Sequence, residues 1–404
     1  MTDVEVDLSA VDLMAPEHRA DPHPVYRAMR AASPVFPSTF EDRTFLLTGF
    51  AECEAILRDP RWSSDPSHRT TMDADIDIRT AMSFSDANIL LFTDPPDHTR
   101  IRKLMSKAFT PRSVEQLRPK VQAIVDELLD GVAERGTVEI VSEIGYTVPV
   151  TVICEMLGVP VADRDRFGPW SSDASRLLDG VLDEETTNRG LLGAMQIIGY
   201  LGELIADRRA EPRDDLLSAL VHAEDDGVGL SEEELRLNTL LLFVAGHETT
   251  MNLIGNGMYA LLQHRDELER LRADPSLIGS AVEELLRYDG PVHVSSRTAT
   301  TDVEVNGHPF RAGDQALTIL AAANRDPARY ADPDRLDIGR DQGPHLTFSY
   351  GIHYCLGAAL ARPEGQVVIN SLVQRFADLV IVTEPVTYRD HFVLRGLKEL
   401  RVSV

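Results

Sequence analysis

The sequence predicts a mainly α-helical fold with a minor β portion, organised as one large domain over residues 1–404. Apolar residues at helical spacing dominate from about Pro96 to Tyr288. Alternating segments typical of strands lie on both sides of that region. Because no repeat, low-complexity tract or flexible linker divides the chain, a single helix-rich unit is expected.

Four segments have the short alternating pattern of β-strands. Thr44–Phe50 is the expected first strand. Thr301–Phe310 alternates around Asn306-Gly307, a dipeptide that favours a two-residue hairpin turn. Ala316–Ala321 and Phe392–Leu397 are expected to form further short strands. The sheet portion is therefore predicted to draw on both ends of the chain.

A long apolar helix is predicted over Leu237–Tyr259, and a polar segment interrupts its pattern at Ala245-Gly246-His247-Glu248-Thr249-Thr250. A glycine, an acid and two threonines are unfavourable inside an apolar helix, and a threonine hydroxyl can bond to a carbonyl one turn earlier. One interpretation is a helix that crosses the face of a cofactor and handles protons there. The other is a capped kink with a solvated glutamate, and the segment alone leaves both open.

The net charge excludes several classes of partner. With 40 basic and 65 acidic residues, the formal charge is −25 at pH 7. Nucleic acids and anionic lipid surfaces repel a chain this acidic, so neither is expected as a partner. The stretch between Asp97 and Glu115 reverses the trend, because it has no acid but contains Arg100, Arg102, Lys103, Lys107 and Arg112.

Three features predict a cytoplasmic protein. Cys53, Cys154 and Cys355 are far apart and odd in number, which argues against a disulfide framework. The N-terminus is acidic and lacks the basic start and apolar centre of a signal peptide. No apolar run is expected to approach the ~18 residues that cross a bilayer, so no membrane association is predicted.

The sharpest chemical signature is the segment FSYGIHYCLGAALAR from Phe348 to Arg362, in which one cysteine stands in a glycine-bracketed turn before a helix. Gly351 and Gly357 let the backbone pass close to a bulky group. The amides and dipole of the following helix are expected to favour the thiolate of Cys355. Such a cysteine is a nucleophile or a metal ligand, for example the thiolate ligand of haem iron. The alternative is a buried, inert cysteine.

This segment resembles the haem-binding loop of the cytochrome P-450 monooxygenases, whose pattern is F-x-x-G-x-x-x-C-x-G. All of its fixed positions are present, as Phe348, Gly351, Cys355 and Gly357. Ser349 stands where many soluble bacterial members have glycine, and Pro363 stands where a helix former is usual, which predicts a local bend. The resemblance extends over nearly the whole chain and implies the single helix-rich cytochrome P-450 fold of the soluble bacterial type.

The resemblance implies a haem b cofactor with Cys355 as the iron ligand and a proton relay on the apolar helix. The family's (A/G)-G-x-(D/E)-T motif matches this chain from Ala245 onward. Glu248 is thereby implied as the relay acid, and Thr249 as the alcohol that helps deliver protons to bound dioxygen. Gly246 is then the point of close approach to the cofactor, and His247 is a residue of the helix face.

Haem carries two propionates, so cations are expected around them. The segment DPPDHTRIR resembles the family's D-x-P-x-H-x-x-x-R helix, in which His98 and Arg102 bind the propionates. Arg297 and His353 match two further propionate-binding positions, and His345 is a weaker candidate. The alternative for His98 and Arg102 is an ordinary pair on a surface helix.

Glu284 and Arg287 lie one helical turn apart and match the family's E-x-x-R element. By itself this spacing is a common surface pair. The resemblance implies a structural pair tied to the segment near Asn324–Pro327 and to the Arg340 region, without a part in the chemistry.

A basic helix face is predicted to dock an external electron donor. This face carries Arg100, Lys103 and Lys107, roughly opposite His98 and Arg102 on the same helix. The chain has no flavin or iron–sulfur motif, and the resemblance implies a ferredoxin as the donor. The alternative is an ordinary solvated helix face.

The resemblance implies insertion of one oxygen atom from O2 into a hydrophobic small molecule, by hydroxylation or epoxidation. Substrate contacts are expected from the loop Trp62–Phe92, from Leu240, Leu241, Val244 and Ala245, from Val292–Ser296, and from Phe392–Leu394. These stretches are mainly aliphatic, so a terpenoid, a fatty-acyl chain or a polyketide would fit.

Three other functions are left open by the residues. A peroxide-driven peroxygenase shares the thiolate ligand but usually lacks the acid–alcohol pair. A non-catalytic haem sensor or carrier needs neither a proton relay nor a donor surface. A zinc protein would use His345, His353 and Cys355 with a fourth ligand.

Overall fold

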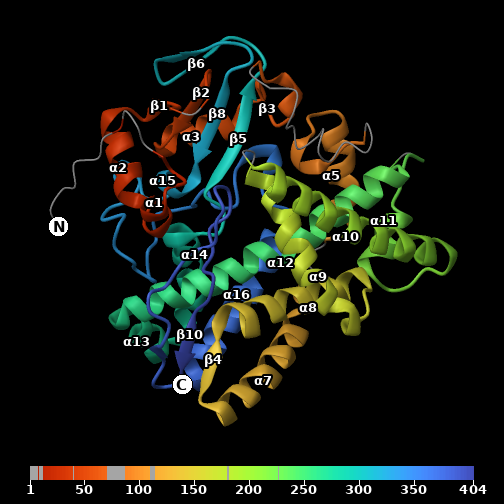
Figure 1. The fold of residues 1–404 in the computed structure, drawn as a ribbon, viewed down its shortest axis with the longest axis vertical. Helices are drawn as coiled ribbons and strands as arrows, with labels where there is room; N and C mark the ends of the chain where they lie inside the picture. The colour runs from red at the N-terminus through yellow and green to blue at the C-terminus, as the bar shows by residue number, and fades with distance from the viewer. Residues whose placement is uncertain are drawn as a thin grey trace.

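Helices form most of the molecule, and the prediction of a mainly α-helical fold with a minor β portion is confirmed (Figure 1). The computed structural model describes residues 8, 12–39, 41–70, 87–109, 114–179, 182–225 and 227–404. The α-helices are α1 (Pro16–Ala20), α2 (His23–Ala32), α3 (Phe50–Arg58), α5 (Asp97–Ala108), α7 (Arg118–Arg135), α8 (Thr147–Leu157), α9 (Arg164–Ser175), α10 (Glu184–Ala210), α11 (Leu216–Val221), α12 (Glu232–Gln263), α13 (Arg265–Ala273), α14 (Ile278–Asp289), α15 (Leu320–Ala323) and α16 (Ala358–Arg375).

Shorter helical pieces connect these helices. The segment Ile140–Tyr146 (η4) is a π-helix that leads directly into α8. The remaining pieces are 3-10 turns: η2 (Pro66–His68), η3 (Leu90–Phe92), η5 (Val161–Asp163), η6 (Arg176–Asp179), η7 (Pro275–Leu277) and η8 (Gly351–His353).

The largest sheet lies at one end of the molecule, uppermost in Figure 1, and joins strands from the N-terminal region to strands β5 and β8, which follow α14. Its strand order is β1-β2-β8-β5-β3, in which β2 and β8 are parallel and the other neighbours are antiparallel. A three-stranded sheet has the order β4-β10-β9, and β6 pairs with β7. The strands are β1 (Val35–Pro37), β2 (Thr44–Leu47), β3 (Trp62–Ser63), β4 (Thr137–Glu139), β5 (Val294–Ala299), β6 (Val303–Val305), β7 (His308–Phe310), β8 (Gln315–Ile319), β9 (Val380–Ile381) and β10 (Arg401–Ser403).

The strand predictions were right in kind but not in every boundary. The hairpin β6–β7 turns at Asn306-Gly307, where both residues have positive φ (48° and 83°), as a two-residue turn of this type requires. The strand expected at Thr44–Phe50 ends at Leu47, because Gly49 caps α3. The strand expected at Ala316–Ala321 is β8, which ends at Ile319, because α15 begins at Leu320.

The strand predicted at Phe392–Leu397 is wrong. This segment makes isolated bridges, Val292 with Leu394 and Tyr388 with Leu397, and no ladder. Its apolar residues pack against different hydrophobic clusters: Phe392 and Val393 against the cluster that contains Val25, and Leu397 within the main core. Alternation alone was therefore a misleading signal there.

Helix α12 is the central helix and carries the polar segment predicted for the cofactor face. A capping box of Ser231 and Glu234 begins it, and it continues through residues 245–250 to Gln263 without a break. It contacts α8, α9, α10, α14 and α16, and the largest hydrophobic cluster surrounds it. The capped-kink alternative is therefore not what the structure shows.

One stretch among the described residues, Ile140–Leu157, is long and apolar enough to cross a membrane. The expectation that no run approaches that length was therefore wrong. Of the residues in this stretch, 72% are buried inside the protein, as is usual for a helix in a protein core.

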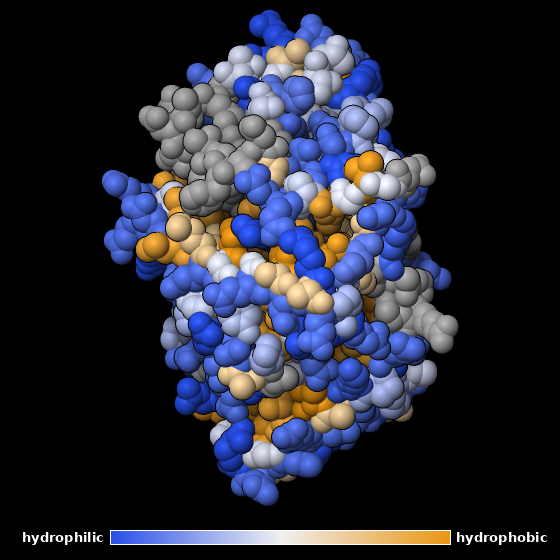
Figure 2. All heavy atoms as spheres, turned by 90° about the vertical axis from the view of Figure 1, so that its right-hand side faces the viewer, coloured by the Kyte–Doolittle hydropathy of each residue, from blue (hydrophilic) through white to orange (hydrophobic). Residues whose placement is uncertain are grey.

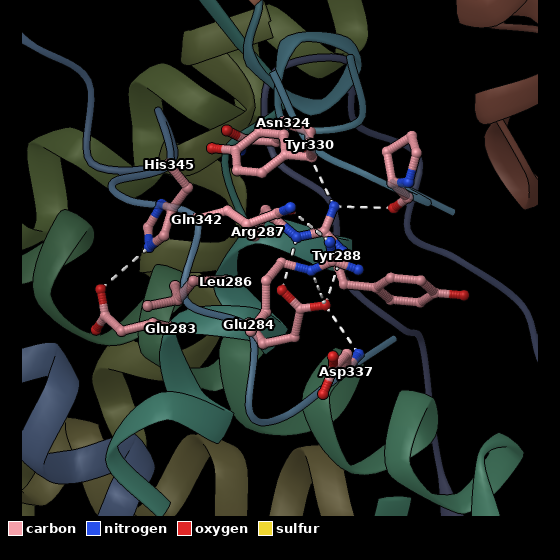
Figure 3. A network of polar contacts seen from close by, with 12 residues as sticks. Glu283, Glu284, Leu286, Arg287, Tyr288, Asn324, Tyr330, Asp337, Gln342 and His345 are labelled. Atoms are coloured by element: carbon pink, nitrogen blue, oxygen red, sulfur yellow. Dashed lines mark hydrogen bonds and ion pairs between the residues drawn. The ribbon is translucent and has the colours of Figure 1, made fainter. Parts of the chain in front are cut away.

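The predicted E-x-x-R pair is a buried structural network (Figure 3). Arg287 donates to both oxygens of Glu284 at 2.6 and 2.8 Å, and each residue is 3% exposed. Arg287 also donates to the carbonyls of Asn324 and Pro333, both at 2.9 Å, while Glu284 accepts from Arg340 Nε at 3.0 Å. Helix α14 is thereby fastened to the segment that leads toward Cys355, as the sequence predicted.

Replacing Glu284 with alanine should destabilise the protein by about 3–5 kcal/mol, because two buried guanidiniums would lose their carboxylate. Urea unfolding followed by circular dichroism measures the change. Glu283 on the same helix is the matched control: its pairs with Arg362 and His345 are partly exposed, so Glu283→Ala should cost about 1 kcal/mol or less. Equal losses would contradict this view of the network.

Candidate active site

Close backbone contacts fix the loop that carries Cys355. Cys355 N donates to Phe348 O at 2.9 Å, and the Phe348 side chain is buried in the main core. Gly351 has φ 69°, and a Cβ there would lie 2.4 Å from Leu57 O of α3. This glycine therefore lets the loop approach α3, not a bulky ligand as the sequence suggested. A Cβ at Gly357 would lie 3.9 Å from Cys355 Sγ, so Gly357 does border the sulfur.

Two residues of the loop region depart from the family pattern. Ser349 has φ 60°, in the left-handed region that glycine adopts readily, and its hydroxyl is buried. Pro363 lies inside α16, which is continuous from Ala358 to Arg375. A local bend at Pro363 stays a prediction.

The electrostatic surroundings of Cys355 differ from the expectation. The side chain has access to solvent, but the protein encloses the sulfur closely enough that burial raises the pKa of the thiol. The amides of Gly357 and Ala358 and the guanidiniums of Arg102 and Arg362 partly oppose that effect. The helix amides do favour the thiolate, as predicted, but the effect of burial is larger, so the net pKa of the thiol is raised. A metal ion at the sulfur would supply the missing stabilisation, because coordination deprotonates a thiol.

Four basic residues predicted for propionate binding converge on one space. His98 and Arg102 come from α5, Arg297 from β5 and His353 from the loop of Cys355; the two imidazole rings are 4.4 Å apart. Burial, Arg297, His98 and Arg102 together lower the pKa of His353 to about 2. The positive charges of these residues therefore repel one another.

No acid forms an ion pair with this cluster within the described part of the chain. Burial lowers the pKa of Arg297 to about 10, and its guanidinium donates to Ser295 Oγ and Ser296 O at 3.1 and 2.7 Å. Neither Arg297 nor Arg102 forms an ion pair with a described residue. Asp94 bonds to Ser63 and Ser64, and its charge partly offsets the effect of burial on the pKa values of His98 and Arg297. Among the described residues, His98 Nε2 and His353 Nε2 are buried without a hydrogen-bond partner.

These residues fit a dianionic group beside a sulfur ligand. Buried cations and orphaned imidazole nitrogens are the donors that two propionates of a haem would satisfy, and Cys355 is the matching iron ligand. The zinc alternative lacks support: across the described residues no group of three His, Cys, Asp or Glu side chains could hold a metal. His345 is not part of the cluster, since its Nε2 lies 3.4 Å from Glu283 Oε2 (Figure 3).

One side of α12 is open in an otherwise buried helix. Ala245 is exposed, and Leu241 and Thr249, one turn to either side, are half-buried. Thr249 Oγ1 donates to Ala245 O at 2.8 Å, the back-bond expected from the sequence. Its oxygen lone pairs remain free to accept a hydrogen bond from this open side. Two of the expected substrate contacts, Leu240 and Val244, are buried in the core.

Two neighbouring residues have packing roles. A Cβ at Gly246 would meet Ile153 Cδ1 at 3.3 Å, so this glycine allows α12 to pack against α8. Gly246 is half-buried beside exposed Ala245, and its close approach to the cofactor stays a prediction. His247 is fully buried; its ring bonds to Phe243 O at 2.7 Å and to Ser171 Oγ at 2.9 Å, which agrees with its prediction as a helix-face residue.

Two residues near the acid–alcohol pair were missed by the sequence analysis. Arg389 Nη1 donates to Glu248 Oε2 at 3.1 Å. Glu364 of α16 is buried behind Thr250, and burial raises its pKa to about 8. Glu364 could have been found, because it is an acid on the apolar face of the helix that follows Cys355. No local pattern marks Arg389, which lies 141 positions from its partner.

The basic face of α5 is already paired within the molecule. Arg100 donates to Glu234, Lys103 Nζ lies 2.7 Å from Asp225 Oδ1, and Lys107 Nζ donates to Glu224 O at 2.6 Å. Lys103 and Lys107 remain about half exposed, whereas Arg100 is largely covered. Figure 2 faces the side that carries α5 in Figure 1, and it shows a mostly polar surface with apolar atoms recessed between polar ones near its middle. Arg112 lies outside the described residues.

A cysteine beside a cluster of basic residues fits a haem-thiolate protein, and comparisons with known proteins give the same class. A family model described as "Cytochrome P450" matches residues 185–399. The chain is 43% identical to the vitamin D(3) 25-hydroxylase of Pseudonocardia autotrophica, over 97% of this chain and 96% of that protein. It is 39% identical to the 6-deoxyerythronolide B hydroxylase of Saccharopolyspora erythraea, over 97% and 98%.

The solved structures agree with the sequence relatives. P450BioI, in a complex with an acyl carrier protein that bears hexadec-9Z-enoic acid, superposes with a TM-score of 0.88 at 36% identity, covering 96% of this chain and 99% of that one. The chain belongs to the cytochrome P450 family. Its cofactor is therefore a haem, and it is a haem-thiolate monooxygenase that acts on a small molecule with O2.

Replacing Arg297 with glutamine should weaken haem binding by about 30-fold or more, since truncating a buried partner of a charged group costs at least about 2 kcal/mol. The rate of haem transfer from the holoprotein to a scavenging globin measures the change. Arg100→Gln is the matched control, because Arg100 is paired with Glu234. It should lower the thermal midpoint without accelerating haem loss. Equal haem loss from both variants would contradict the proposed cation cluster.

Proposed function

We propose that this enzyme holds haem b through Cys355 and uses it to hydroxylate or epoxidise a hydrophobic small molecule. The observation that carries the proposal is the cluster of His98, Arg102, Arg297 and His353, which has no ion-paired acid in the described structure and borders the sulfur. When bound, haem supplies the dioxygen chemistry, and the protein binds, orients and controls protons. We further propose that residues 1–404 act as one domain, in the cytoplasm.

Proton handling is assigned to Glu248 and Thr249 on α12. Glu248 is buried, so it can hold a proton away from bulk water. Thr249 directs its own hydroxyl hydrogen to Ala245 O and therefore accepts, on the open side, a hydrogen bond from the group it serves. Aliphatic residues on the same helix, such as Leu241, limit the entry of water to that side.

The substrate is proposed to lie over the open side of α12. Leu241 and Ala245 would contact it from the helix, and Phe392 and Val393, both half-buried, would contact it from the C-terminal segment. Ser296 of β5 is an exposed polar handle. The expected loop Trp62–Phe92 falls partly on residues 71–86, which are outside the described chain. Relatives named for vitamin D(3) and for a deoxyerythronolide support a bulky apolar substrate.

The iron ligand is tested by Cys355→Ala. The reduced variant with carbon monoxide should lose the strongly red-shifted Soret band of thiolate-bound haem, and turnover with ferredoxin, its reductase and NAD(P)H should stop. Cys154→Ala is the control, because that cysteine lies in the core away from the loop and its loss should leave the band in place. A Cys355→Ala protein that keeps its pigment, its band and its turnover would refute the proposal.

Electrons are proposed to come from an acidic ferredoxin that docks at Arg100, Lys103 and Lys107. Lys103 and Lys107 are the exposed members, and a donor carboxylate could replace Asp225 as their partner. Arg100 would shape the site from beneath, because it is held by Glu234.

The double variant Lys103→Glu/Lys107→Glu should slow reduction by ferredoxin at low salt and weaken its salt dependence, because steering by exposed charges is screened by ions. Stopped-flow reduction at several ionic strengths measures both effects. The control for net charge compares the single variants Lys103→Glu and Lys120→Glu on α7, which change the charge equally, since Lys120 is equally exposed. If these two single variants have the same salt dependence, the donor binds elsewhere.

A further inference from the structure

Helix α10 presents an apolar surface to solvent in a strongly acidic protein. From Gly190 to Gly202 its sequence has no charged residue, although the whole chain has a net charge of −25. Leu192 and Met195 in this stretch are 60% and 49% exposed. The opposite face of the helix, which carries buried residues such as Ile197, packs against α9, α11 and α12 (Figure 1). The exposed face therefore leaves large apolar side chains in water, as an interaction surface does.

The exposed residues of α10 follow a regular repeat. Successive members are three and then four positions apart, which is the spacing of the contact line in a coiled coil. All of them are exposed except one glycine, which is half-buried. This line, the α10 seam, consists of Glu185, Asn188, Leu192, Met195, Gly199, Gly202, Ala206 and Arg209. It runs along most of the helix, so it could pack along one other helix.

Two glycines of the α10 seam have no steric explanation among the described residues. A Cβ at Gly199 would meet no described atom of the surrounding structure within 4 Å, and one at Gly202 would lie 3.5 Å from Arg236 Nε, an ordinary contact. Alanine would fit at both positions and would stabilise the helix, because glycine is unfavourable in a helix interior. The two glycines leave notches in the seam, into which side chains of a facing helix can fit.

A second copy of α10 in antiparallel orientation supplies those side chains. In a two-fold symmetric pair, residue i faces residue j of the other copy while j faces i. A two-fold axis level with Ile197 places Leu192 opposite Gly202 of the other copy. It also places Met195 opposite Gly199, so each large side chain meets a notch. A parallel pair would set Met195 against Met195 and would leave the glycines facing each other across a gap.

Charged residues along the α10 seam match the same antiparallel arrangement. Glu185 at one end would face Arg209 of the other copy. Arg189 and Glu203 border the seam on one side, so each would lie beside its opposite charge. All four residues are exposed, and the intramolecular pairs of Arg189 and Arg209 leave each about half exposed. The helix dipole also favours acids at the start of α10 and bases at its end, but it does not account for the glycines.

We propose that this enzyme associates as a two-fold symmetric dimer through the antiparallel α10 seam. The occupant of the apolar face is thus a second copy of the same chain. A single helix pair is small for a protein interface, so the dimer is expected to be reversible and concentration-dependent. The inference does not depend on the haem chemistry, and its failure would leave the proposed function intact.

Sedimentation velocity of the haem-loaded enzyme over a range of concentrations tests the dimer, at about 0.15 M salt, where repulsion between the acidic copies is screened beyond about 8 Å. The wild type should pass from monomer to dimer as the concentration rises. Gly199→Lys should weaken the dimer by about tenfold or more, because it buries an unpaired charge in the notch. It should also raise the thermal midpoint of the monomer, since lysine is the better helix former.

Gly279→Lys on α14 is the matched control for Gly199→Lys, because a Cβ at Gly279 also meets no described atom within 4 Å. It should leave the dissociation constant of the dimer unchanged. A wild type that stays monomeric at every concentration would overturn the inference, even if it bound lipid vesicles or another protein. Equal effects of the two glycine variants on the dimer would overturn it as well.

Exchanging charges tests the antiparallel register. Glu185→Arg and Arg209→Glu should each weaken the dimer by about fivefold, since a symmetric dimer reverses two exposed ion pairs at once. The double variant Glu185→Arg/Arg209→Glu should recover most of that loss, because opposite charges face each other again. Glu134→Arg, an exposed position on α7, is the control for net charge and should leave the dimer unchanged. A double variant that dimerises no better than the single variants would overturn the proposed interface.

Discussion

The site depends on an electrostatic conflict: four basic residues share one space, and no described acid forms an ion pair with any of them. Burying uncompensated positive charge is unfavourable, and the low pKa values of Arg297 and His353 record that cost. The three elements that supply these residues come from different parts of the chain, so the conflict is built by the fold as a whole. A dianionic cofactor resolves it, which explains why so acidic a protein keeps these positions basic.

The E-x-x-R network connects the helical core to the loop that carries the cysteine. Arg287 holds the carbonyl of Asn324, and Asn324 in turn accepts from Leu346 N at 2.7 Å and donates to Thr347 Oγ1 at 2.9 Å. Thr347 bonds back to Leu286 O on α14. Helix α14 and the residues just before Phe348 are therefore one bonded unit, and the position of the sulfur is set by contacts made well away from it.

Local sequence patterns predicted the features that depend on interactions between residues close together in the chain. Helical spacing, the Asn306-Gly307 turn and the cysteine loop are encoded within a few residues, and each was found where it was expected. Long-range pairing is different: no spacing rule joins Arg389 to Glu248 or Lys103 to Asp225. The Phe392–Leu397 error has the same origin, because alternating side chains suit either a strand or a segment that touches several neighbours in turn.

Ser349 gives the cysteine loop a property that its relatives with glycine do not share. A side chain held in a left-handed backbone conformation costs roughly 1–2 kcal/mol, and its buried hydroxyl has no partner in the described structure to repay that cost. The turn is thus under conformational tension before any ligand arrives. The backbone bonds that hold the loop, Ser349 N to Leu346 O and Cys355 N to Phe348 O, must offset this cost, so the stability of the turn and the position of the sulfur are thermodynamically linked.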